Sequence, residues 1–351
     1  MEYEKLLQFS ITGIKQETPL AKTYELKLLN EEILNYKPGQ FLTFILKTKN
    51  QELRRSYSIV SLPGEPLKIT VKKVENGLIS RYILQNWKTG EIIEALPPAG
   101  WFTTEPLPNA KRDIFCFAAG SGIIPILPQI RTLLIEEPQS IIHLIYSNHN
   151  EGDALFLEEI DVLAKNFAAL NVMNFFSDPL SRLDERGRLS NLNVEPLINR
   201  LLKHEKEDAI FLICGPFSYM RMLQFTIGIM KFRKENVKRE NYLPEVMRSG
   251  KVSHPDFPAR TVTIGFRDRV YRVRVPSGKN ILEAALENEL HLPYSCKGGI
   301  CGNCAAICRA GKVFMSINEV LTDADLEKGW VLTCTGYPET EGIIINFNIE
   351  P

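Results

Sequence analysis

Hydrophobic and polar residues follow three different patterns along this chain of 351 residues. From residue 1 to about 106, short segments alternate between apolar and polar positions, as in Lys22–Leu29 and Leu67–Val74, and turn-forming pairs such as Pro38-Gly39 separate them. Alternation with a period of two is typical of strands that bury one face. Many short strands broken by turns predict a small antiparallel β-barrel.

The pattern changes over residues 107–238, where continuous apolar runs alternate with helical stretches. Asp113–Ala118 precedes the helical segment Pro125–Ile135, and Ala209–Cys214 precedes Phe217–Lys231. Strands buried on both faces and separated by helices indicate a parallel sheet covered by helices on both sides. This part of the chain is therefore expected to be an α/β domain.

A third pattern occupies residues 258–351, after a segment rich in Pro, Ser and Gly over 239–257 that reads as a linker. Val262–Phe266 and Val270–Val275 alternate like the two strands of a hairpin, and Asn280 precedes an amphipathic stretch, residues 281–290, as a helix cap. We expect a compact unit of mixed strands and one main helix here.

Composition and charge place the chain among soluble globular proteins. Lys+Arg and Asp+Glu both number 42, so no net field attracts nucleic acid or an anionic membrane. Met1–Lys5 carries acids and lacks the apolar stretch of a signal peptide, which leads us to expect a cytoplasmic protein. The uncharged run Ile114–Ile130 approaches membrane-spanning length, but Pro125, Pro128 and several glycines interrupt it. It is better explained as a buried strand, a turn and a helix.

Four cysteines in the last block have the spacing by which thiolates hold a plant-type [2Fe–2S] cluster. Four residues separate the first two, two the next pair, and 29 the last pair, at Cys296, Cys301, Cys304 and Cys334. Glycines between the ligands allow the backbone to wrap closely and point N–H groups at sulfur. A structural zinc site is the alternative, although such sites more often use two short cysteine pairs. Cys308 and Cys116 are read as buried structural residues.

A flavin-type motif stands in the first block, at Arg55-Ser56-Tyr57-Ser58. A flavin dinucleotide requires an arginine for its pyrophosphate, an aromatic plane against the isoalloxazine, and a hydroxyl near the reactive nitrogen. Further along, Val71–Val74 runs into Gly77–Ser80, which can open a helix whose N–H groups meet phosphate. On its own, Arg-x-Tyr-Ser is equally consistent with an edge strand that exposes its arginine.

Two glycine-containing loops follow buried strands of the second block. Phe117–Pro125 contains Gly120-Ser121-Gly122 and leads into a helix, and Ile213–Pro216 ends a later strand. The first loop is not Gly-x-Gly-x-x-Gly, so the standard dinucleotide fingerprint does not apply. Both loops lie at the carboxyl ends of strands, where open parallel sheets bind ligands.

In this order, the motifs resemble the ferredoxin–NADP reductase superfamily with a C-terminal plant-type [2Fe–2S] ferredoxin domain, over essentially the whole chain. Within it, Tyr294–Cys304 and Gly329–Cys334 look most like the reductase subunit of phenylacetyl-CoA oxygenase and related oxygenase reductases. The resemblance implies an antiparallel β-barrel that binds FAD, an α/β parallel-sheet domain that binds NAD(P)H, and an α+β (β-grasp) ferredoxin domain. Their expected bounds are 1–106, 107–238 and 258–351.

The resemblance also implies roles for individual residues. Catalytic contacts fall to Tyr57, Ser58 and Cys214: Tyr57 packs on the isoalloxazine, Ser58 bonds near its N5, and Cys214 borders the nicotinamide. The flavin contacts are Arg55, Tyr57, Ser58, Val71, Val74, Gly77, Leu78, Ile79 and Ser80. The nicotinamide contacts are Gly120, Ser121, Gly122, Cys214, Gly215 and Pro216. Because another domain follows the nucleotide domain, we expect none of the terminal aromatic residues that cover the flavin in plant reductases.

The choice of nicotinamide donor depends on the loop after the strand that ends at Phe176. In relatives that use NADPH an arginine often follows the serine there, whereas Asp178 follows Ser177 in this chain. A carboxylate repels the 2′-phosphate and can accept from a ribose hydroxyl, which favours NADH. Arg182 and Arg186 count against this preference, and Asp178 is also explained as a turn residue before Pro179.

These features together predict an NAD(P)H-dependent oxidoreductase. A nicotinamide delivers an electron pair as hydride and the cluster accepts single electrons, so a flavin must stand between them. The low potential of plant-type clusters suits an oxygenase component, or another one-electron acceptor protein, as partner. The alternatives are a general ferredoxin or flavodoxin reductase without a dedicated oxygenase, a flavoprotein with a zinc-holding interaction module, and a redox sensor.

Overall fold

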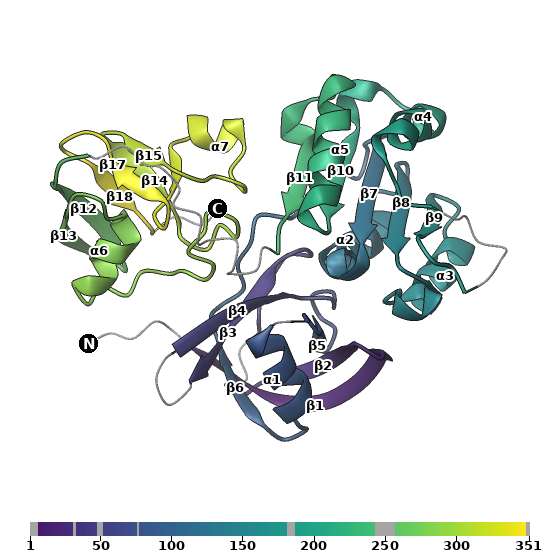
Figure 1. Ribbon diagram of the computed structural model, residues 1–351, viewed down its shortest axis with the longest axis horizontal. Coiled ribbons are helices and arrows are strands. Elements are labelled where there is room, and N and C mark those ends of the chain that lie inside the picture. Colours follow the sequence, from purple (N-terminus) through teal and green to yellow (C-terminus); the bar gives the residue numbers. More distant parts are fainter. Residues whose placement is uncertain are drawn as a thin grey trace.

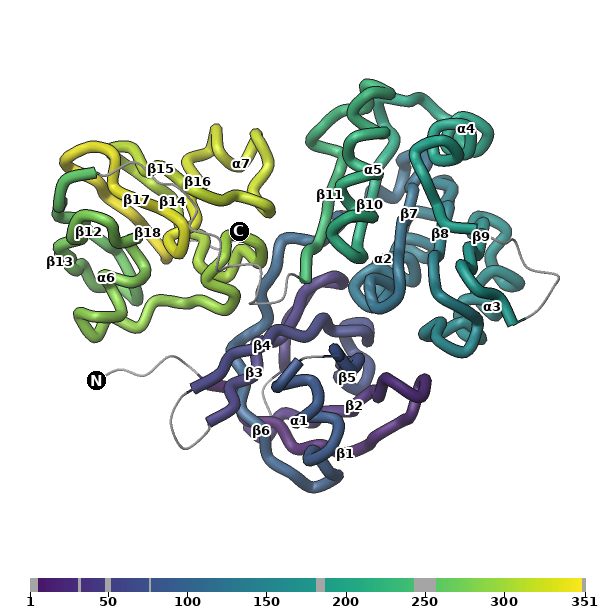
Figure 2. The backbone as a smooth tube through the Cα atoms, in the orientation of Figure 1, coloured from purple at the N-terminus to yellow at the C-terminus, as the bar shows by residue number. Residues whose placement is uncertain are grey.

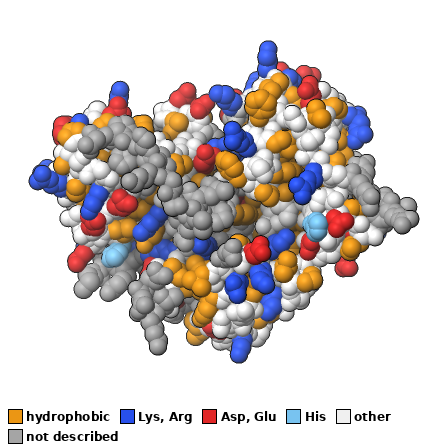
Figure 3. Space-filling view, in the orientation of Figure 1, with side chains coloured by type: hydrophobic (Ala, Val, Ile, Leu, Met, Phe, Trp, Pro, Cys, Tyr) orange, Lys and Arg blue, Asp and Glu red, His pale blue; other side chains and the backbone are white. Residues whose placement is uncertain are grey.

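The computed structural model describes residues 6–30, 33–47, 52–75, 77–180, 187–242 and 257–348, and these form three units (Figure 1). An N-terminal antiparallel sheet, a central parallel sheet and a C-terminal mixed sheet follow one another along the chain. This arrangement confirms the fold class predicted from the sequence. Over the face shown in Figure 3, acidic and basic side chains are interspersed, in keeping with the zero net charge.

The N-terminal unit is a six-stranded antiparallel barrel. Its strands are β1 (Leu7–Thr18), β2 (Ala21–Leu28), β3 (Phe41–Lys47), β4 (Glu52–Ser58), β5 (Leu67–Lys72) and β6 (Ile92–Ala95), in the order β4-β3-β6-β1-β2-β5. A bridge between Ile59 and Ile69 joins the ends of the two outer strands and closes the barrel. Helix α1 (Leu78–Asn86) follows β5, and after it Trp87 packs edge-on against Tyr24 and Phe44 in the core.

The central unit is a five-stranded parallel sheet with helices on both faces. Its strands are β7 (Asp113–Ala119), β8 (Ile141–Asn148), β9 (Leu170–Phe176), β10 (Ile210–Cys214) and β11 (Val237–Glu240), in the order β11-β10-β7-β8-β9. Its α-helices are α2 (Ile123–Glu136), α3 (Leu157–Asn166), α4 (Asn191–Leu201) and α5 (Phe217–Ile229). Its 3-10 turns are η1 (Gly120–Gly122), η2 (Glu151–Asp153), η3 (Lys206–Asp208) and η4 (Lys234–Asn236).

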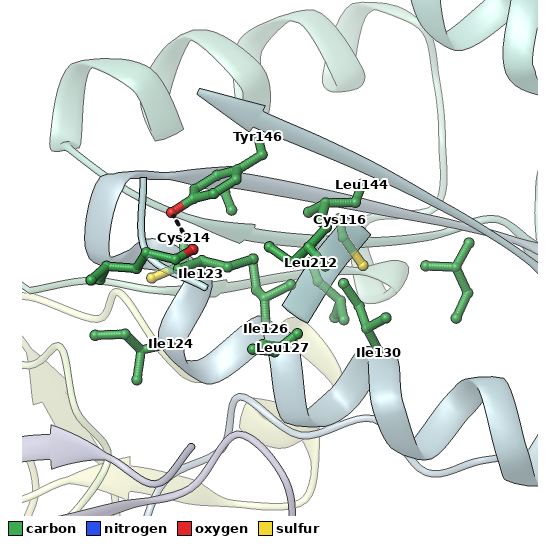
Figure 4. Packing of buried hydrophobic residues seen from close by; sticks show 14 of the residues in the cluster. Cys116, Ile123, Ile124, Ile126, Leu127, Ile130, Leu144, Tyr146, Leu212 and Cys214 are labelled. Carbon is green, nitrogen blue, oxygen red and sulfur yellow. Dashed lines mark hydrogen bonds between the residues drawn. The ribbon is translucent and has the colours of Figure 1, made fainter. Parts of the chain in front are cut away.

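Alternate residues of the parallel strands feed two separate cores. On one face, Ile126 and Leu127 of α2 pack against Cys116 and Leu212 (Figure 4), and α3 joins the same cluster. On the other face α4 and α5 pack against a second cluster that contains Phe115, Phe117, Phe211 and Ile213. The uncharged run is thus β7, η1 and α2, as predicted. Within the described residues, no helix has both the length and the apolarity needed to span a membrane.

The boundary between the second unit and the linker differs in detail from expectation. β11 pairs in parallel with β10 and ends at Glu240, beyond position 238 where the sequence placed the end of the nucleotide domain. Asn241 and Tyr242 follow it outside any helix or strand. The rest of the predicted linker, residues 243–256, lies outside the described residues.

The C-terminal unit is a mixed sheet with one helix packed on it, the β-grasp arrangement. Its strands are β12 (Arg260–Phe266), β13 (Arg269–Val275), β14 (Ala305–Ala310), β15 (Val313–Met315), β16 (Trp330–Leu332), β17 (Gly336–Pro338) and β18 (Ile344–Asn346). The main sheet has the order β13-β12-β18-β14-β16, and β15 pairs with β17. The helices are α6 (Ile281–Glu287) and α7 (Asp323–Glu327).

The main helix of this unit begins where the sequence predicted and ends earlier. Asn280 accepts from the Glu283 N–H and Glu283 reaches back to the Asn280 N–H, a complete capping box. Glu289 has a φ of 57°, a left-handed conformation that a helix cannot contain. The helix therefore stops at Glu287 instead of continuing to Leu290 as the apolar pattern suggested.

Candidate functional site

A cavity of about 890 Å³ lies between the barrel and the parallel sheet. It is lined by the end of β5 on the barrel side and by the carboxyl ends of the parallel strands on the other, at Lys72, Lys73, Val74, Gly120, Ser121, Ser147, Asn148, His149, Phe175, Ser177, Arg188, Gly215, Pro216, Tyr219, Asn241 and Tyr242 among others. Open parallel sheets bind ligands at this edge. Of the predicted nicotinamide residues, Gly120, Ser121, Gly215 and Pro216 line the cavity.

The two glycine loops meet directly behind the cavity. A Cβ on Gly122 would lie 2.0 Å from the carbonyl oxygen of Cys214 and 3.0 Å from the Gly215 nitrogen. Gly120 has a φ of 55°, which also favours glycine. Gly122 is therefore needed for the close approach of the two loops, and it stands behind the cavity wall instead of in it.

The end of β8 presents buried polar atoms to the cavity. Ser147 Oγ and both amide atoms of Asn148, Oδ1 and Nδ2, are shielded from solvent, and the two side chains lie beside the hydroxyls of Tyr219 and Tyr146, respectively. Buried polar groups normally have partners. Both residues line the cavity, so the site offers donors and acceptors to a polar ligand such as a dinucleotide.

The residues expected to select the donor are arranged differently from the prediction. Asp178 is not among the cavity-lining residues; its carboxylate lies 3.8 Å from His149 Nε2 at the surface. Ser177 and Arg188 do line the cavity, and Arg188 was missed because it follows the turn by ten positions. Arg182 and Arg186 lie outside the described residues. The preference for NADH therefore stays a prediction.

The predicted flavin residues are distributed between two sides of the barrel wall. Arg55, Tyr57 and Ser58 are on β4. The Tyr57 side chain is partly buried against the barrel core, with its ring centre 6.1 Å from that of Phe44, and this burial raises the pKa of its hydroxyl. The side chains of Val71 and Ile79 point into the barrel core. Residues buried in this way can meet a flavin only through their backbone.

The turn before α1 is held by its own side chains. Ser80 Oγ accepts from the Val74 N–H at 3.1 Å and donates to the Gly77 carbonyl at 3.3 Å. A Cβ on Gly77 would come within 2.7 Å of Ser80 Oγ. Leu78 is exposed at the first turn of the helix. Ser80 thus shapes the loop, while the helix N-terminus beside Gly77 stays available to phosphate.

Three polar side chains from distant parts of the chain meet at the inner end of β4. Ser58 Oγ lies 2.7 Å from the Tyr242 hydroxyl and 3.4 Å from Glu240 Oε2, and the Tyr242 hydroxyl donates to the same carboxylate at 3.3 Å. The Cys214 thiol is fully buried beside them, which raises its pKa. Ser58 and Cys214, both predicted, are thus brought together by two residues that the sequence analysis placed in the linker.

Tyr242 bears on the expectation that no terminal aromatic residue covers the flavin. It is an aromatic residue that follows the last parallel strand, which ends at Glu240, although a further domain comes later in the chain. Its ring is 40% exposed and lines the cavity. The signal in the sequence was an acid and an aromatic two positions apart, Glu240-x-Tyr242, after the last apolar strand.

Burial makes Glu240 an unusual carboxyl group. Removal from water raises its pKa from 4.5 to about 8, and the hydrogen bonds from Tyr242 and Ser58 only partly oppose this shift. At neutral pH the side chain therefore keeps a proton, held within reach of the Ser58 hydroxyl. A group whose pKa lies close to the reaction pH is suited to proton transfer.

Replacing Glu240 with glutamine is expected to stabilise the protein, and more so at pH 8 than at pH 5. Between these values the unfolded chain releases the Glu240 proton while the folded chain retains it, so ionisation favours unfolding increasingly as the pH rises. Glutamine removes this effect. We expect the melting temperature of Glu240→Gln to exceed that of the wild type by at least about 2 °C at pH 8.

Glu94→Gln is the matched control for this change, with the opposite sign. The Lys47 ammonium lowers the pKa of the Glu94 carboxyl, so its contribution is present above the unfolded pKa and lost as the pH falls. Glutamine at 94 should therefore lower the melting temperature slightly at pH 8. A Glu240→Gln protein whose melting temperature has the same pH dependence as the wild type would show that Glu240 is not protonated at neutral pH.

The four predicted cluster ligands converge on one side of the C-terminal sheet. Cys296, Cys304 and Cys334 are buried and Cys301 is partly so. Hydrogen bonds from the Cys301 and Cys334 thiols lower the pKa of Cys296, and the same contacts raise those of its two partners. Cys334 also contacts Cys304. Among the described residues, no group of three or more His, Cys, Asp or Glu side chains is arranged to hold a single metal ion.

The backbone around these thiols has the shape that glycine permits. Gly299 and Gly302 both have a φ of 72°, and a Cβ on Gly299 would meet the Ile317 carbonyl at 2.5 Å. The Gly298 N–H donates to the Cys296 sulfur at 3.3 Å, and Thr333 Oγ1 donates to the Cys304 carbonyl. Amide hydrogen bonds to sulfur and a buried thiol set fit a [2Fe–2S] cluster.

Cys308 lies outside this set, as expected. Its thiol donates to the Ala310 carbonyl at 3.2 Å, and burial raises its pKa. Cys116 is fully buried between α2 and the parallel sheet. Neither thiol is placed to bind a metal with the other four.

Family models match the three units in the order in which they fold. An oxidoreductase FAD-binding domain matches residues 8–103, an oxidoreductase NAD-binding domain residues 117–224, and a 2Fe-2S iron-sulfur cluster binding domain residues 267–339. The chain is thus a FAD-, NAD- and [2Fe–2S]-binding oxidoreductase, and the cofactors predicted from the sequence are confirmed.

Similar proteins extend over nearly the whole chain. One component of the 1,2-phenylacetyl-CoA epoxidase of Escherichia coli is 31% identical, covering 91% of this chain and 90% of that protein. The ferredoxin reductase component of 3-ketosteroid-9-alpha-monooxygenase from Rhodococcus rhodochrous is 30% identical over 89% and 88%. The structure of phthalate dioxygenase reductase superposes with a TM-score of 0.58 at 20% identity over 98% of both chains, and so shares the fold.

Proposed function

This chain belongs to the ferredoxin–NADP reductase superfamily, among the members that carry a C-terminal plant-type [2Fe–2S] ferredoxin domain, and on that premise we propose that it takes hydride from NADH and delivers single electrons to an oxygenase component. One observation carries the proposal: the cavity, the strand β4 with the predicted flavin motif, and four converging cysteine thiols occur together in one chain. We assign residues 1–106, 107–238 and 258–351 to the three steps of this electron chain.

Arg55, Tyr57 and Ser58 of β4 and the residues of the two glycine loops hold the two dinucleotides. Arg55 supplies a fixed cation for the flavin pyrophosphate, and the N–H groups after Gly77 add a helix N-terminus. Gly120 and Ser121 on one loop, with Gly215 on the other, border the nicotinamide end of the cavity. FAD, when bound, supplies the chemistry that accepts an electron pair and passes electrons on singly.

Ser58, Glu240 and Tyr242 hold the proton that accompanies this chemistry. The Glu240 carboxyl is protonated at neutral pH and is joined to Ser58 Oγ by a 3.4 Å contact. Tyr242 presents its ring to the cavity and its hydroxyl to both partners. Because Glu240 is buried, its proton reaches the cavity through the hydroxyls of Ser58 and Tyr242.

The acceptor is proposed from the relatives. The epoxidase component and the monooxygenase reductase component both serve multi-component oxygenases by name, which supports an oxygenase component as the partner here. The cluster of this chain is its final internal carrier, because it exchanges single electrons, as a one-electron acceptor protein does.

The test is an anaerobic absorbance titration of the purified protein, first with NADH and then with NADPH. We expect both flavin and iron–sulfur bands to bleach with a small excess of NADH, and NADPH to bleach them only at higher concentration. Iron and zinc analysis accompanies the titration. A protein that contains zinc and no iron would establish the interaction-module alternative, and faster bleaching by NADPH would reverse the donor assignment.

A further inference from the structure

The C-terminal unit lies beside the barrel (Figure 2), and its cluster-binding loop contacts strand β4 through hydrogen bonds. Ser56 Oγ lies 2.7 Å from Ser295 Oγ. Arg54 Nη1 donates to the Tyr294 carbonyl at 3.2 Å, and its guanidinium lies 4.0 Å from the centre of the Tyr294 ring. Ser295 immediately precedes the ligand Cys296. A hydroxyl pair and a cation–π contact thus anchor the first ligand to the barrel.

A second contact holds the same loop from its other side. The indole of Trp101, in the segment that leaves the barrel after β6, lies against Gly302, where a Cβ would come 2.5 Å from the ring. The same indole packs edge-on against Trp330 with ring centres 4.7 Å apart. Gly302 directly follows the ligand Cys301. The barrel therefore contacts the loop next to two of its four thiols.

Alternate residues of β4 consequently serve two different neighbours. Successive side chains of a strand point to opposite faces. Arg55 and Tyr57 are on one face and belong to the flavin motif, while Arg54 and Ser56 on the other face hold the C-terminal loop. The route from Tyr57 to Cys296 is two peptide bonds and one 2.7 Å contact between hydroxyl oxygens.

We propose that Arg54, Ser56 and Trp101 are positioning residues that hold the cluster loop on β4 and thereby set the rate of electron transfer from flavin to cluster. The inference rests on the proposed function and adds to it three residues that are not among the predicted flavin contacts. Each passage oxidises the flavin by one electron and reduces the cluster by one, and no bond to these residues forms or breaks. The two electrons of one hydride need two passages, and the acceptor protein takes the first electron before the second passage.

The experiment is anaerobic stopped-flow mixing of the holoprotein with NADH, following flavin and iron–sulfur absorbance separately. The variants are Ser56→Ala, Trp101→Ala and their combination. We expect flavin bleaching at the wild-type rate in all three, because none of them touches the cavity. The cluster should be reduced more slowly, by about tenfold or more in the double variant, since small displacements of reacting groups are costly.

Two controls separate positioning from general damage. Thr43→Val removes the other hydroxyl neighbour of Ser56, at 3.0 Å, and leaves the contact with Ser295, so cluster reduction should keep the wild-type rate. Trp101→Phe should restore most of the rate lost in Trp101→Ala. The midpoint potentials of flavin and cluster should stay unchanged throughout, because driving force is not what the contact alters.

Wild-type cluster reduction in the Ser56→Ala/Trp101→Ala protein would overturn the proposal. If that double variant does not fold, Ser56→Ala alone decides the question, because it removes one oxygen from a partly buried site. A wild-type protein that lacks iron–sulfur absorbance, or whose flavin does not bleach with NADH or NADPH, would instead overturn the proposed function. The two failures are therefore distinguishable in the same traces.

Discussion

Replacing Cys301 with alanine is expected to remove the [2Fe–2S] cluster and abolish electron delivery to a protein acceptor, while oxidation of the nicotinamide by ferricyanide continues. Alanine has no thiolate, and a cluster bound through three of four thiols loses the closed ligand set that keeps both irons in place. The proposed flavin site uses other residues, on β4 and at the end of β11. Iron content, visible absorbance and the rates with the protein acceptor and with ferricyanide, all measured on one preparation, test whether the two activities separate in this way.

Cys308→Ser is the matched control, because Cys308 is a thiol of the same unit that donates to the Ala310 carbonyl instead of facing the other four. It should keep full iron content and both activities. If Cys301→Ala retained its iron, the four-thiol assignment would be wrong. If Cys301→Ala lost ferricyanide reduction together with its iron, the cluster would be required for the integrity of the flavin site, and the two functions would not be separable.

Replacing Gly122 with alanine is expected to lower kcat/KM for the nicotinamide donor by about a hundredfold or more, because a misplacement of about 1 Å at a binding site has effects of this size. The added methyl group would lie 2.0 Å from the Cys214 carbonyl oxygen and 2.5 Å from its carbon. Both are backbone atoms at the end of a central strand, so neither moves easily. The two loops that border the cavity must separate, which also costs about 1–3 kcal/mol of stability.

Gly228→Ala tests the same chemical change where the structure has room for it. Gly228 is in α5, and a Cβ there would have no heavy atom within 4 Å. Alanine should be neutral or stabilise the helix by about 0.5–1 kcal/mol. Steady-state oxidation of NADH with ferricyanide and thermal melting of both variants complete the comparison. An unaltered kcat/KM in Gly122→Ala would show that the loops do not need their close approach.

The parts of this protein that the sequence predicted are those in which spacing along the chain directly encodes geometry. Cys296, Cys301 and Cys304 share one loop, so their separation in sequence largely fixes their separation in space. The strand, Gly120–Gly122 turn and α2 form one continuous segment for the same reason. Local order of this kind is readable without any knowledge of the tertiary structure.

What the sequence did not predict depends on contacts between distant segments. Glu240 and Tyr242 look like the start of a linker, and only the pairing of β11 with β10 brings them to Ser58, more than 180 positions earlier in the chain. Ser56 and Trp101 likewise look like ordinary barrel residues until the C-terminal unit is placed against them. A periodic pattern in the sequence does not reveal such contacts, because each one joins single residues from two distant segments.

The alternation of β4 has a consequence for hybrid reductases. Arg55 and Tyr57 alternate with Arg54 and Ser56, so deleting or inserting one residue in this strand would turn each set toward the wrong neighbour. If the C-terminal unit is exchanged for that of another reductase, the loop of the new unit must therefore fit the side chains that β4 presents to it. The donor ferredoxin must present small and aromatic residues where Ser295 and Tyr294 stand, or the acceptor strand must be rewritten with it. The alternation of side chains along β4 therefore limits how freely the C-terminal unit can be exchanged.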